Sequence, residues 1–170
     1  DPARFPEPAA PPARPLTAAF VGRMVPYKGP DMLLEAAAPL LRENRLRVHM
    51  VGDGPLASSV RAQAETLPGV TVHGWLAHGE VCRVLADCHL LAFPSIREFG
   101  GGVVLEAMAM GVVPMIVDYA GPGELVSGTT GIRIPIGTRA EIVAGYRRAL
   151  AHCAAEPEAL AAQAAAARAR

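Results

Sequence analysis

The sequence predicts an α/β protein built on a Rossmann-like, doubly wound parallel sheet of six strands. Two observations predict this fold class. Short apolar runs alternate with longer segments of helical character along the chain, as in proteins that connect parallel strands through helices. Several of the runs, such as L-L-A-F at 90–93 and V-V-P-M-I-V at 112–117, are apolar throughout. Continuous apolar runs are typical of strands whose two faces are both covered by helices.

The alternation gives each element an expected place. Strands are predicted over residues 17–21, 46–51, 70–73, 89–93, 113–117 and 131–134. Helices are predicted over residues 30–43, 56–66, 78–86, 103–110, 122–126 and 139–151. By analogy with doubly wound folds we expect the strand order 3-2-1-4-5-6, in which ligands bind beyond the carboxyl ends of the first and fourth strands.

The chain divides into three parts by composition. Residues 1–15 hold six of the sixteen prolines and are predicted to be an extended linker. Residues 16–152 form the predicted ligand-binding domain. Residues 153–170 are rich in alanine and are predicted to be a helical tail, although few large apolar side chains are present to anchor it. Because the first residue is Asp rather than Met, we expect a processed chain or a piece of a longer protein.

The composition excludes several classes of function. With a formal net charge of zero the chain lacks the basic surface expected of a nucleic-acid-binding domain. No apolar run is long enough to predict a membrane span or a signal peptide. Cys82, Cys88 and Cys153 lack metal-ligand spacing and are odd in number, which indicates reduced thiols in a cytoplasmic protein.

Two glutamates eight positions apart, Glu98 and Glu106, enclose three consecutive glycines after the fourth predicted strand. A glycine loop that leads into a helix offers free backbone N–H groups and the positive end of the helix dipole to a phosphate. The carboxylates cannot bind phosphate, but they can accept hydrogen bonds from hydroxyl groups. This arrangement predicts a nucleotide-sugar site. Each glutamate taken singly is also explained as an ordinary loop or first-turn residue.

The loop after the first strand adds two cations, Arg23 and Lys28, next to Gly22. In the crevice they would flank a diphosphate and stabilise its charge as it departs. Solvated loop charges remain the alternative, since loops are commonly polar. Gly74 and Trp75 end the third strand, where Trp75 is expected either to stack on a base or to pack as a partly exposed aromatic.

Together these segments resemble the C-terminal, donor-binding domain of retaining group 1 glycosyltransferases with the GT-B fold. The resemblance is carried by V-G-R-M-V-P-Y-K-G at 21–29, V-G-D-G-P at 51–55, V-H-G-W-L at 72–76, F-P-S-I-R-E-F-G-G-G-V-V-L-E-A-M-A-M-G at 93–111, Y-A-G-P-G-E-L-V at 119–126 and T-G-I-R-I-P at 130–135. The matched segments fill most of this chain and about half of such an enzyme.

The resemblance implies a role for each matched residue. Arg23 and Lys28 would bind the donor diphosphate, Glu98 the sugar hydroxyls and Glu106 the ribose hydroxyls, with Arg23, Lys28 and Glu98 as the catalytic residues. Main chain near the end of the third strand would frame the base. The full set of implied donor-binding residues is Gly22, Arg23, Lys28, Gly74, Trp75, Leu76, Glu98, Gly100, Gly101, Gly102, Val103 and Glu106.

The resemblance also implies what the protein does and what it lacks. It predicts transfer of a sugar, of hexosyltransferase type, from a nucleoside-diphosphate donor to an acceptor hydroxyl, with no metal or other cofactor. An N-terminal acceptor domain would be missing, so this chain alone is predicted to be inactive. Polysaccharide or glycolipid assembly in the cytoplasm, at the inner face of the membrane where the missing domain attaches there, is typical of the family.

Three alternatives stay open. A degenerate relative would keep the domain for binding without catalysis, although Arg23, Lys28 and both glutamates are present. A sugar-nucleotide epimerase would share the two-domain architecture. A phosphorylase of this fold would need a lysine for pyridoxal phosphate, and the only lysine of the chain is Lys28.

Overall fold

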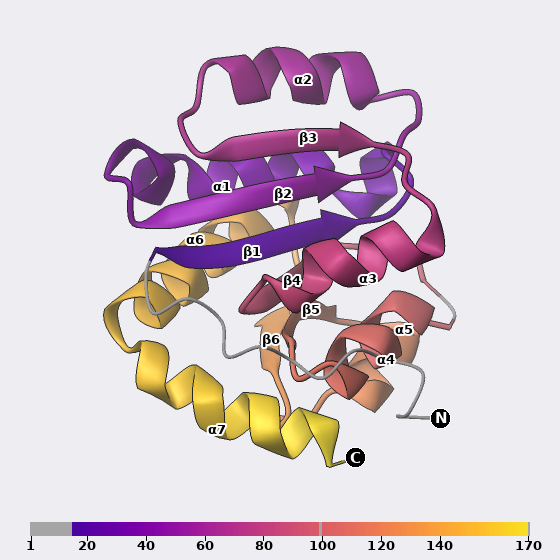
Figure 1. Cartoon of the computed structure of the whole chain (residues 1–170), viewed down its shortest axis with the longest axis vertical. Coiled ribbons are helices and arrows are strands. Elements are labelled where there is room, and N and C mark those ends of the chain that lie inside the picture. The colour runs from indigo at the N-terminus through magenta and orange to yellow at the C-terminus, as the bar shows by residue number, and fades with distance from the viewer. Residues whose placement is uncertain (1–14, 99, 170) are drawn as a thin grey trace.

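A six-stranded parallel sheet forms the centre of the protein (Figure 1). The computed structural model describes residues 15–98 and 100–169, so nearly all of the predicted linker lies outside the described residues. The strand order is β3-β2-β1-β4-β5-β6, as the doubly wound prediction requires. The predicted fold class is therefore confirmed.

The elements lie close to their predicted positions. The strands are β1 (Leu16–Val21), β2 (Leu46–Val51), β3 (Val70–Gly74), β4 (Leu90–Phe93), β5 (Val113–Asp118) and β6 (Ile132–Pro135). The helices are α1 (Pro30–Arg42), α2 (Ala57–Glu65), α3 (His78–Ala86), α4 (Gly102–Ala109), α5 (Ala120–Leu125), α6 (Arg139–Ala155) and α7 (Pro157–Arg168). A single 3-10 turn, Pro26–Lys28, lies in the loop after β1.

Two apolar cores lie on the two faces of the sheet. In β1, Ala18 and Phe20 join the core beneath α1, α2 and α6, whereas Ala19 joins the core beneath α3 and α4. Figure 1 shows the same two helical layers, with α1 and α6 behind the sheet and α3 and α4 in front. Successive side chains of a strand point to opposite faces. Continuous apolar runs therefore fill both cores, as expected from the sequence.

The alanine-rich tail is anchored to the domain. α6 continues to Ala155, so the boundary predicted after residue 152 falls inside this helix. In α7, Leu160 and Ala167 are buried in the two cores. The Gln163 amide donates hydrogen bonds to the carbonyl oxygens of Gly128 and Gly131, each at 3.2 Å. A few well-placed contacts hold a helix that has few large apolar residues.

Hydrogen bonds join the loops that follow neighbouring strands at the carboxyl edge of the sheet. The Gly22 amide donates to the Val51 carbonyl at 3.0 Å, and the Gly52 amide donates to the Gly74 carbonyl at 2.8 Å. The Ile96 amide donates to the Tyr27 carbonyl at 2.9 Å, which links the loops after β1 and β4. These bonds fix the edge where the predicted ligand residues gather. Within residues 15–98 and 100–169, no helix is both long enough and apolar enough to cross a membrane.

His49 is expected to make folding stability depend on pH. Its Nδ1 lies 2.9 Å from Nε2 of His73, so that a single hydrogen joins the two rings. Burial, and then the charge of His73, lowers the pKa of His49 below its ordinary value of 6.5. The unfolded chain therefore binds a proton more readily than the folded chain. Stability should fall as the pH drops through 6.5 towards the pKa of the folded state, and level off below it.

Urea unfolding of the wild type and of His49→Gln between pH 8 and pH 5 would test this expectation. The variant should lose less stability than the wild type as the pH falls, because it lacks the group that titrates differently in the two states. His152→Gln, at an exposed position of α6, is the control and should keep the wild-type slope. Parallel slopes for all three proteins would contradict the role given to His49.

Candidate functional site

Two adjoining cavities form a groove at the carboxyl edge of the sheet. The larger, of about 540 Å³, is bounded by the loops after β1, β2 and β3, and the smaller, of about 230 Å³, by the loops after β1 and β4 and by the start of α4. Val21 and Gly22 line both. The groove therefore spans the position between β1 and β4 at which doubly wound folds bind ligands.

Lys28 and Glu98 form an ion pair across the smaller cavity. The Lys28 Nζ lies 2.9 Å from Oε2 of Glu98, and both side chains are only about one-fifth exposed, at 19% and 22%. The Lys28 ammonium also lies over the Phe93 ring, 5.7 Å from its centroid. The loop after β1 and the loop after β4 each contribute one member, so the two predicted residues meet only because β1 and β4 are neighbours.

The glycine run places the start of α4 against the same cavity. Gly101 has a left-handed backbone with φ of 57°, and a Cβ there would press on Leu125. Gly102 begins α4, and a Cβ at Gly100 or Gly102 would meet nothing within 4 Å. The first amides of a helix have no acceptor inside the helix. Gly101 is therefore needed by the backbone, while Gly102 leaves open space beside the first turn of α4.

Glu106 lies one helical turn beyond Gly102 and Val103, which line the smaller cavity. Its Oε1 lies 3.2 Å from Nε2 of His78, the first residue of α3, and its side chain is 31% exposed. The Nδ1 of the same imidazole lies 3.9 Å from the Cys82 sulfur. Burial, and then the charge of Glu106, raises the pKa of the Cys82 thiol. The carboxylate therefore belongs to a three-residue chain that links α4 to α3.

Other predicted residues line the larger cavity. Arg23 is exposed, lines this cavity and makes no ion pair within the part of the chain that the structure describes. Trp75, which is 75% exposed, and Leu76 directly follow β3 and form part of the cavity wall. Arg23 thus lines one cavity and Lys28 the other, and Val21 and Gly22 line both. The structure brings both predicted cations to one groove.

Three of the predicted residues, Gly74, Gly100 and Glu106, are not part of the cavity walls. Gly74 is buried, and its carbonyl accepts the Gly52 amide. Gly100 is exposed at the entry to α4. The set of site residues predicted from the sequence did not include several wall residues, namely Val21, Val51, Gly52, Asp53, Gly54, Val81 and Phe93. Their positions at strand ends could have suggested some of them. Nothing in the sequence pointed to His78.

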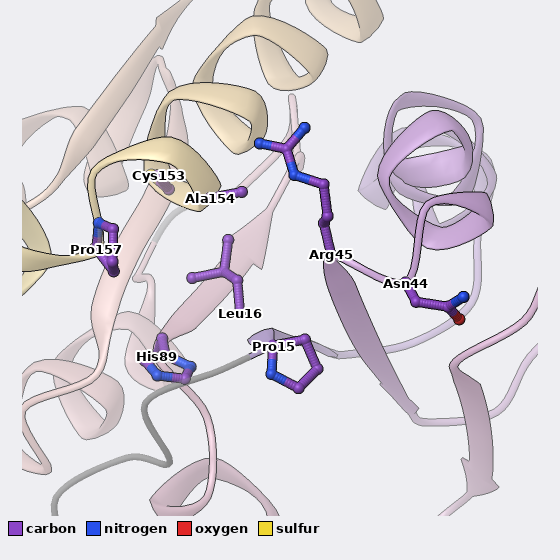
Figure 2. A pocket seen from close by; sticks show the side chains of 8 residues that line it. All are labelled: Pro15, Leu16, Asn44, Arg45, His89, Cys153, Ala154 and Pro157. Carbon is purple, nitrogen blue, oxygen red and sulfur yellow. The ribbon is translucent and has the colours of Figure 1, made fainter.

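Another cavity, of about 270 Å³, lies at the amino ends of the strands, on the opposite edge of the sheet (Figure 2). Leu16, Arg45, His89 and Cys153 are among its wall residues. None of the predicted site residues lines it. Among the described residues, no group of three or more His, Cys, Asp or Glu side chains is placed to hold a metal ion. The expectation of a metal-independent reaction stays a prediction.

The sequence matches a known family over the whole of the predicted domain. The family described as glycosyl transferases group 1 covers residues 15–152. The chain belongs to the group 1 glycosyltransferases. The predicted family resemblance is therefore confirmed.

Similar group 1 glycosyltransferases include two bacterial proteins of named activity. The D-inositol 3-phosphate glycosyltransferase of Gordonia bronchialis is 34% identical over 157 residues, which are 84% of this chain and 33% of that protein. The alpha-D-kanosaminyltransferase of Streptomyces kanamyceticus is 34% identical over 125 residues, 68% of this chain and 31% of that protein. The chain thus spans about a third of the length of these relatives.

Solved glycosyltransferases share the fold. HepE of Anabaena, solved with UDP and glucose, superposes with a TM-score of 0.79 at 24% identity and covers 92% of this chain, which corresponds to 43% of HepE. The pneumococcal O-GlcNAc transferase GtfA, solved with UDP and GlcNAc, gives a TM-score of 0.80 at 20% identity over 95% of this chain and 33% of GtfA. At these identities the likeness shows the fold, and it agrees with the predicted half of a GT-B architecture.

Proposed function

We propose that this chain is the nucleotide-sugar-binding part of a retaining glycosyltransferase that moves a sugar from a nucleoside diphosphate to an acceptor hydroxyl. The observation that carries the proposal is the groove. Two cations, the Glu98 carboxylate and a helix N-terminus, predicted from separate segments of sequence, line its two cavities, and Glu106 lies one helical turn beyond. Relatives named for glycosyl transfer support the same reading.

The two cavities and the wall residues that they share would hold the nucleoside, the sugar and the diphosphate of such a donor. The diphosphate would lie over Val21 and Gly22, with Arg23 and Lys28 on its two sides and the amides at the start of α4 facing it. The nucleoside would occupy the larger cavity beside Trp75. The sugar would lie in the smaller cavity, where its hydroxyls would bond to Glu98.

Binding of the donor would replace the ion pair between Lys28 and Glu98 with contacts from each of these side chains to the donor. A diphosphate would take the Lys28 ammonium, and the sugar hydroxyls would take the Glu98 carboxylate that is set free. In the transfer, the bond from the anomeric carbon to the diphosphate breaks and its electron pair leaves with the diphosphate. Arg23 and Lys28 would stabilise that charge. The acceptor oxygen would bond to the same face of the sugar, and its proton would pass to the departing diphosphate.

Exposed apolar side chains support a second domain that covers the groove. Five of the six large apolar side chains that are exposed among the described residues follow the carboxyl ends of strands: Tyr27, Trp75, Ile96, Tyr119 and Ile136. Apolar patches that gather on one side of a domain mark interaction surfaces. We infer that the acceptor-binding domain lies over this edge and excludes water during transfer. The chain alone would then bind the donor weakly and transfer nothing.

Calorimetric titration with UDP, GDP and ADP and their sugar conjugates would test the donor site. UDP comes first, because both HepE and GtfA were solved with it. We expect saturable binding of one nucleotide. Glu106→Ala should weaken it about tenfold, since a hydrogen bond to a charged group contributes roughly 1.5–3 kcal/mol and neighbouring water recovers part of it.

Glu65→Ala is the matched control, because Glu65 is an exposed glutamate at the far end of α2. It should bind as tightly as the wild type. Sugar transfer by the purified 170-residue chain would contradict the inferred need for a second domain. Binding of a nucleotide with equal strength in Glu106→Ala would remove Glu106 from the site.

A further inference from the structure

We propose that His78 is a positioning residue that orients the Glu106 carboxylate for the ribose hydroxyls of the donor, with Cys82 holding the imidazole from its other side. The inference rests on the proposed function, because it concerns how that same site recognises the nucleoside. It assigns a role to a residue that the sequence pattern did not mark.

The contact joins two elements that are distant in the sequence. His78 begins α3 and Glu106 lies in α4, 28 positions further along the chain, yet Nε2 and Oε1 are 3.2 Å apart. Val81, one turn after His78, lines the larger cavity, and Val103, one turn before Glu106, lines the smaller one. Residues three apart on a helix lie on the same side. The pair therefore lies on the sides of α3 and α4 that face the groove, one helical turn from its walls.

The chemistry of the three side chains decides which group donates in the contacts that join Cys82, His78 and Glu106. A carboxylate only accepts, so Nε2 carries the hydrogen that His78 gives to Glu106. In a neutral ring Nδ1 is then an acceptor, and the Cys82 sulfur lies 3.9 Å from it. Because burial raises the pKa of Cys82, this residue stays a thiol and can donate. One tautomer satisfies both contacts, which fixes the ring and through it the carboxylate.

The start of α3 does not need His78 for its own stability. The Glu80 carboxylate accepts the Ala77 amide at 3.0 Å and so satisfies a helix N-terminal donor. The His78 side chain is 67% exposed, so it fills no core. Within residues 15–98 and 100–169, His78 is the only side chain that bonds to the Glu106 carboxylate. One carboxylate oxygen is thus held while the side chain stays accessible to a ligand hydroxyl.

Calorimetric titration of His78→Ala and His78→Gln with nucleotides that do or do not carry ribose hydroxyls would test the proposal. The probes are UDP, GDP and ADP together with their 2′,3′-dideoxy forms. His78→Ala should weaken binding of the intact nucleotide by roughly three- to tenfold. It should leave the dideoxy affinity unchanged, because the hydroxyls that Glu106 would bind are missing. His78→Gln keeps an N–H donor and should recover most of the loss.

His152→Ala is the matched control, since His152 is exposed on α6, lies 3.7 Å from the Glu156 carboxylate and is outside the walls of the groove. It should bind like the wild type. Equal weakening of the intact and dideoxy nucleotides by His78→Ala, or no weakening at all, would overturn the role of His78 alone. Failure of the wild type to bind any of the three nucleotides would overturn the donor site, and the His78 inference with it.

Discussion

Replacing Lys28 with alanine is expected to weaken binding of the nucleoside diphosphate by roughly 10- to 100-fold. The size follows from the loss of one charge-assisted hydrogen bond in a partly enclosed site, which contributes about 1.5–3 kcal/mol. Lys28 is 19% exposed in its side chain, so water screens its charge less than it screens the exposed Arg23. Calorimetric titration at two salt concentrations would measure the loss of affinity in Lys28→Ala and how far salt screens the contribution of the Lys28 charge.

The position of the Lys28 side chain is fixed by the protein itself. Its ammonium lies 2.9 Å from Glu98 and 5.7 Å from the centre of the Phe93 ring, so its position is fixed from two sides. Gly29, left-handed with φ of 65°, ends the short 3-10 turn that carries the lysine. A cation that is already ordered loses little conformational entropy when it binds. Binding a diphosphate would require Lys28 to give up its ion pair with Glu98, which would limit the affinity for a diphosphate that carries no sugar.

Two further variants separate this reading from a simple effect of charge. Arg97 lies in the same loop as Glu98 and over the Tyr27 ring, but it lines neither cavity, so Arg97→Ala removes an equal charge nearby and should change affinity little. Glu98→Gln removes the competing carboxylate while Lys28 stays. It should not weaken the diphosphate alone, and it should reduce the extra affinity contributed by a sugar. A loss in Arg97→Ala as large as in Lys28→Ala would contradict a specific contact.

The fold could be predicted because both helical layers leave a clear trace in the sequence. β4 and β5 are apolar on both sides, and turn residues separate them from the helices. The sheet order came from analogy rather than from periodicity, and the structure bears it out. The tail was harder to predict, because its anchoring depends on a few residues. Leu160 and Gln163 find partners in segments that no local pattern reveals.

The site could be predicted in its parts but not in its connections. Arg23, Lys28, Glu98 and the glycine run are local motifs, and all of these residues except Gly100 line the groove. The ion pair of Lys28 with Glu98 spans 70 positions, and the contact of His78 with Glu106 spans 28. Such pairs form only after β1 lies beside β4 and α3 beside α4. A lone histidine at a helix start carries no sign of them in the sequence.

Replacing Gly52 with alanine is expected to destabilise the domain by about 2–4 kcal/mol and to weaken nucleotide binding at the same time. Gly52 has φ of 133°, a conformation that a side chain disfavours, and a Cβ there would overlap the carbonyl oxygen of Gly22. The loops after β1 and β2 approach each other this closely because the Gly22 amide donates to Val51 at 3.0 Å. Urea unfolding would measure the first effect and calorimetry the second.

The losses of stability and of nucleotide binding would both come from the displaced Gly22 carbonyl. Gly22 lines both cavities, so a displacement of its carbonyl changes the wall against which the diphosphate would lie. Gly79→Ala is the matched control, because a Cβ at this helical position of α3 meets nothing within 4 Å, and it should leave stability equal or raise it by up to about 1 kcal/mol. Loss of binding in Gly52→Ala with full stability would show that the loops after β1 and β2 can move apart without cost, and would contradict the expected destabilisation. Loss of stability with full binding would mean that the diphosphate does not lie against Gly22.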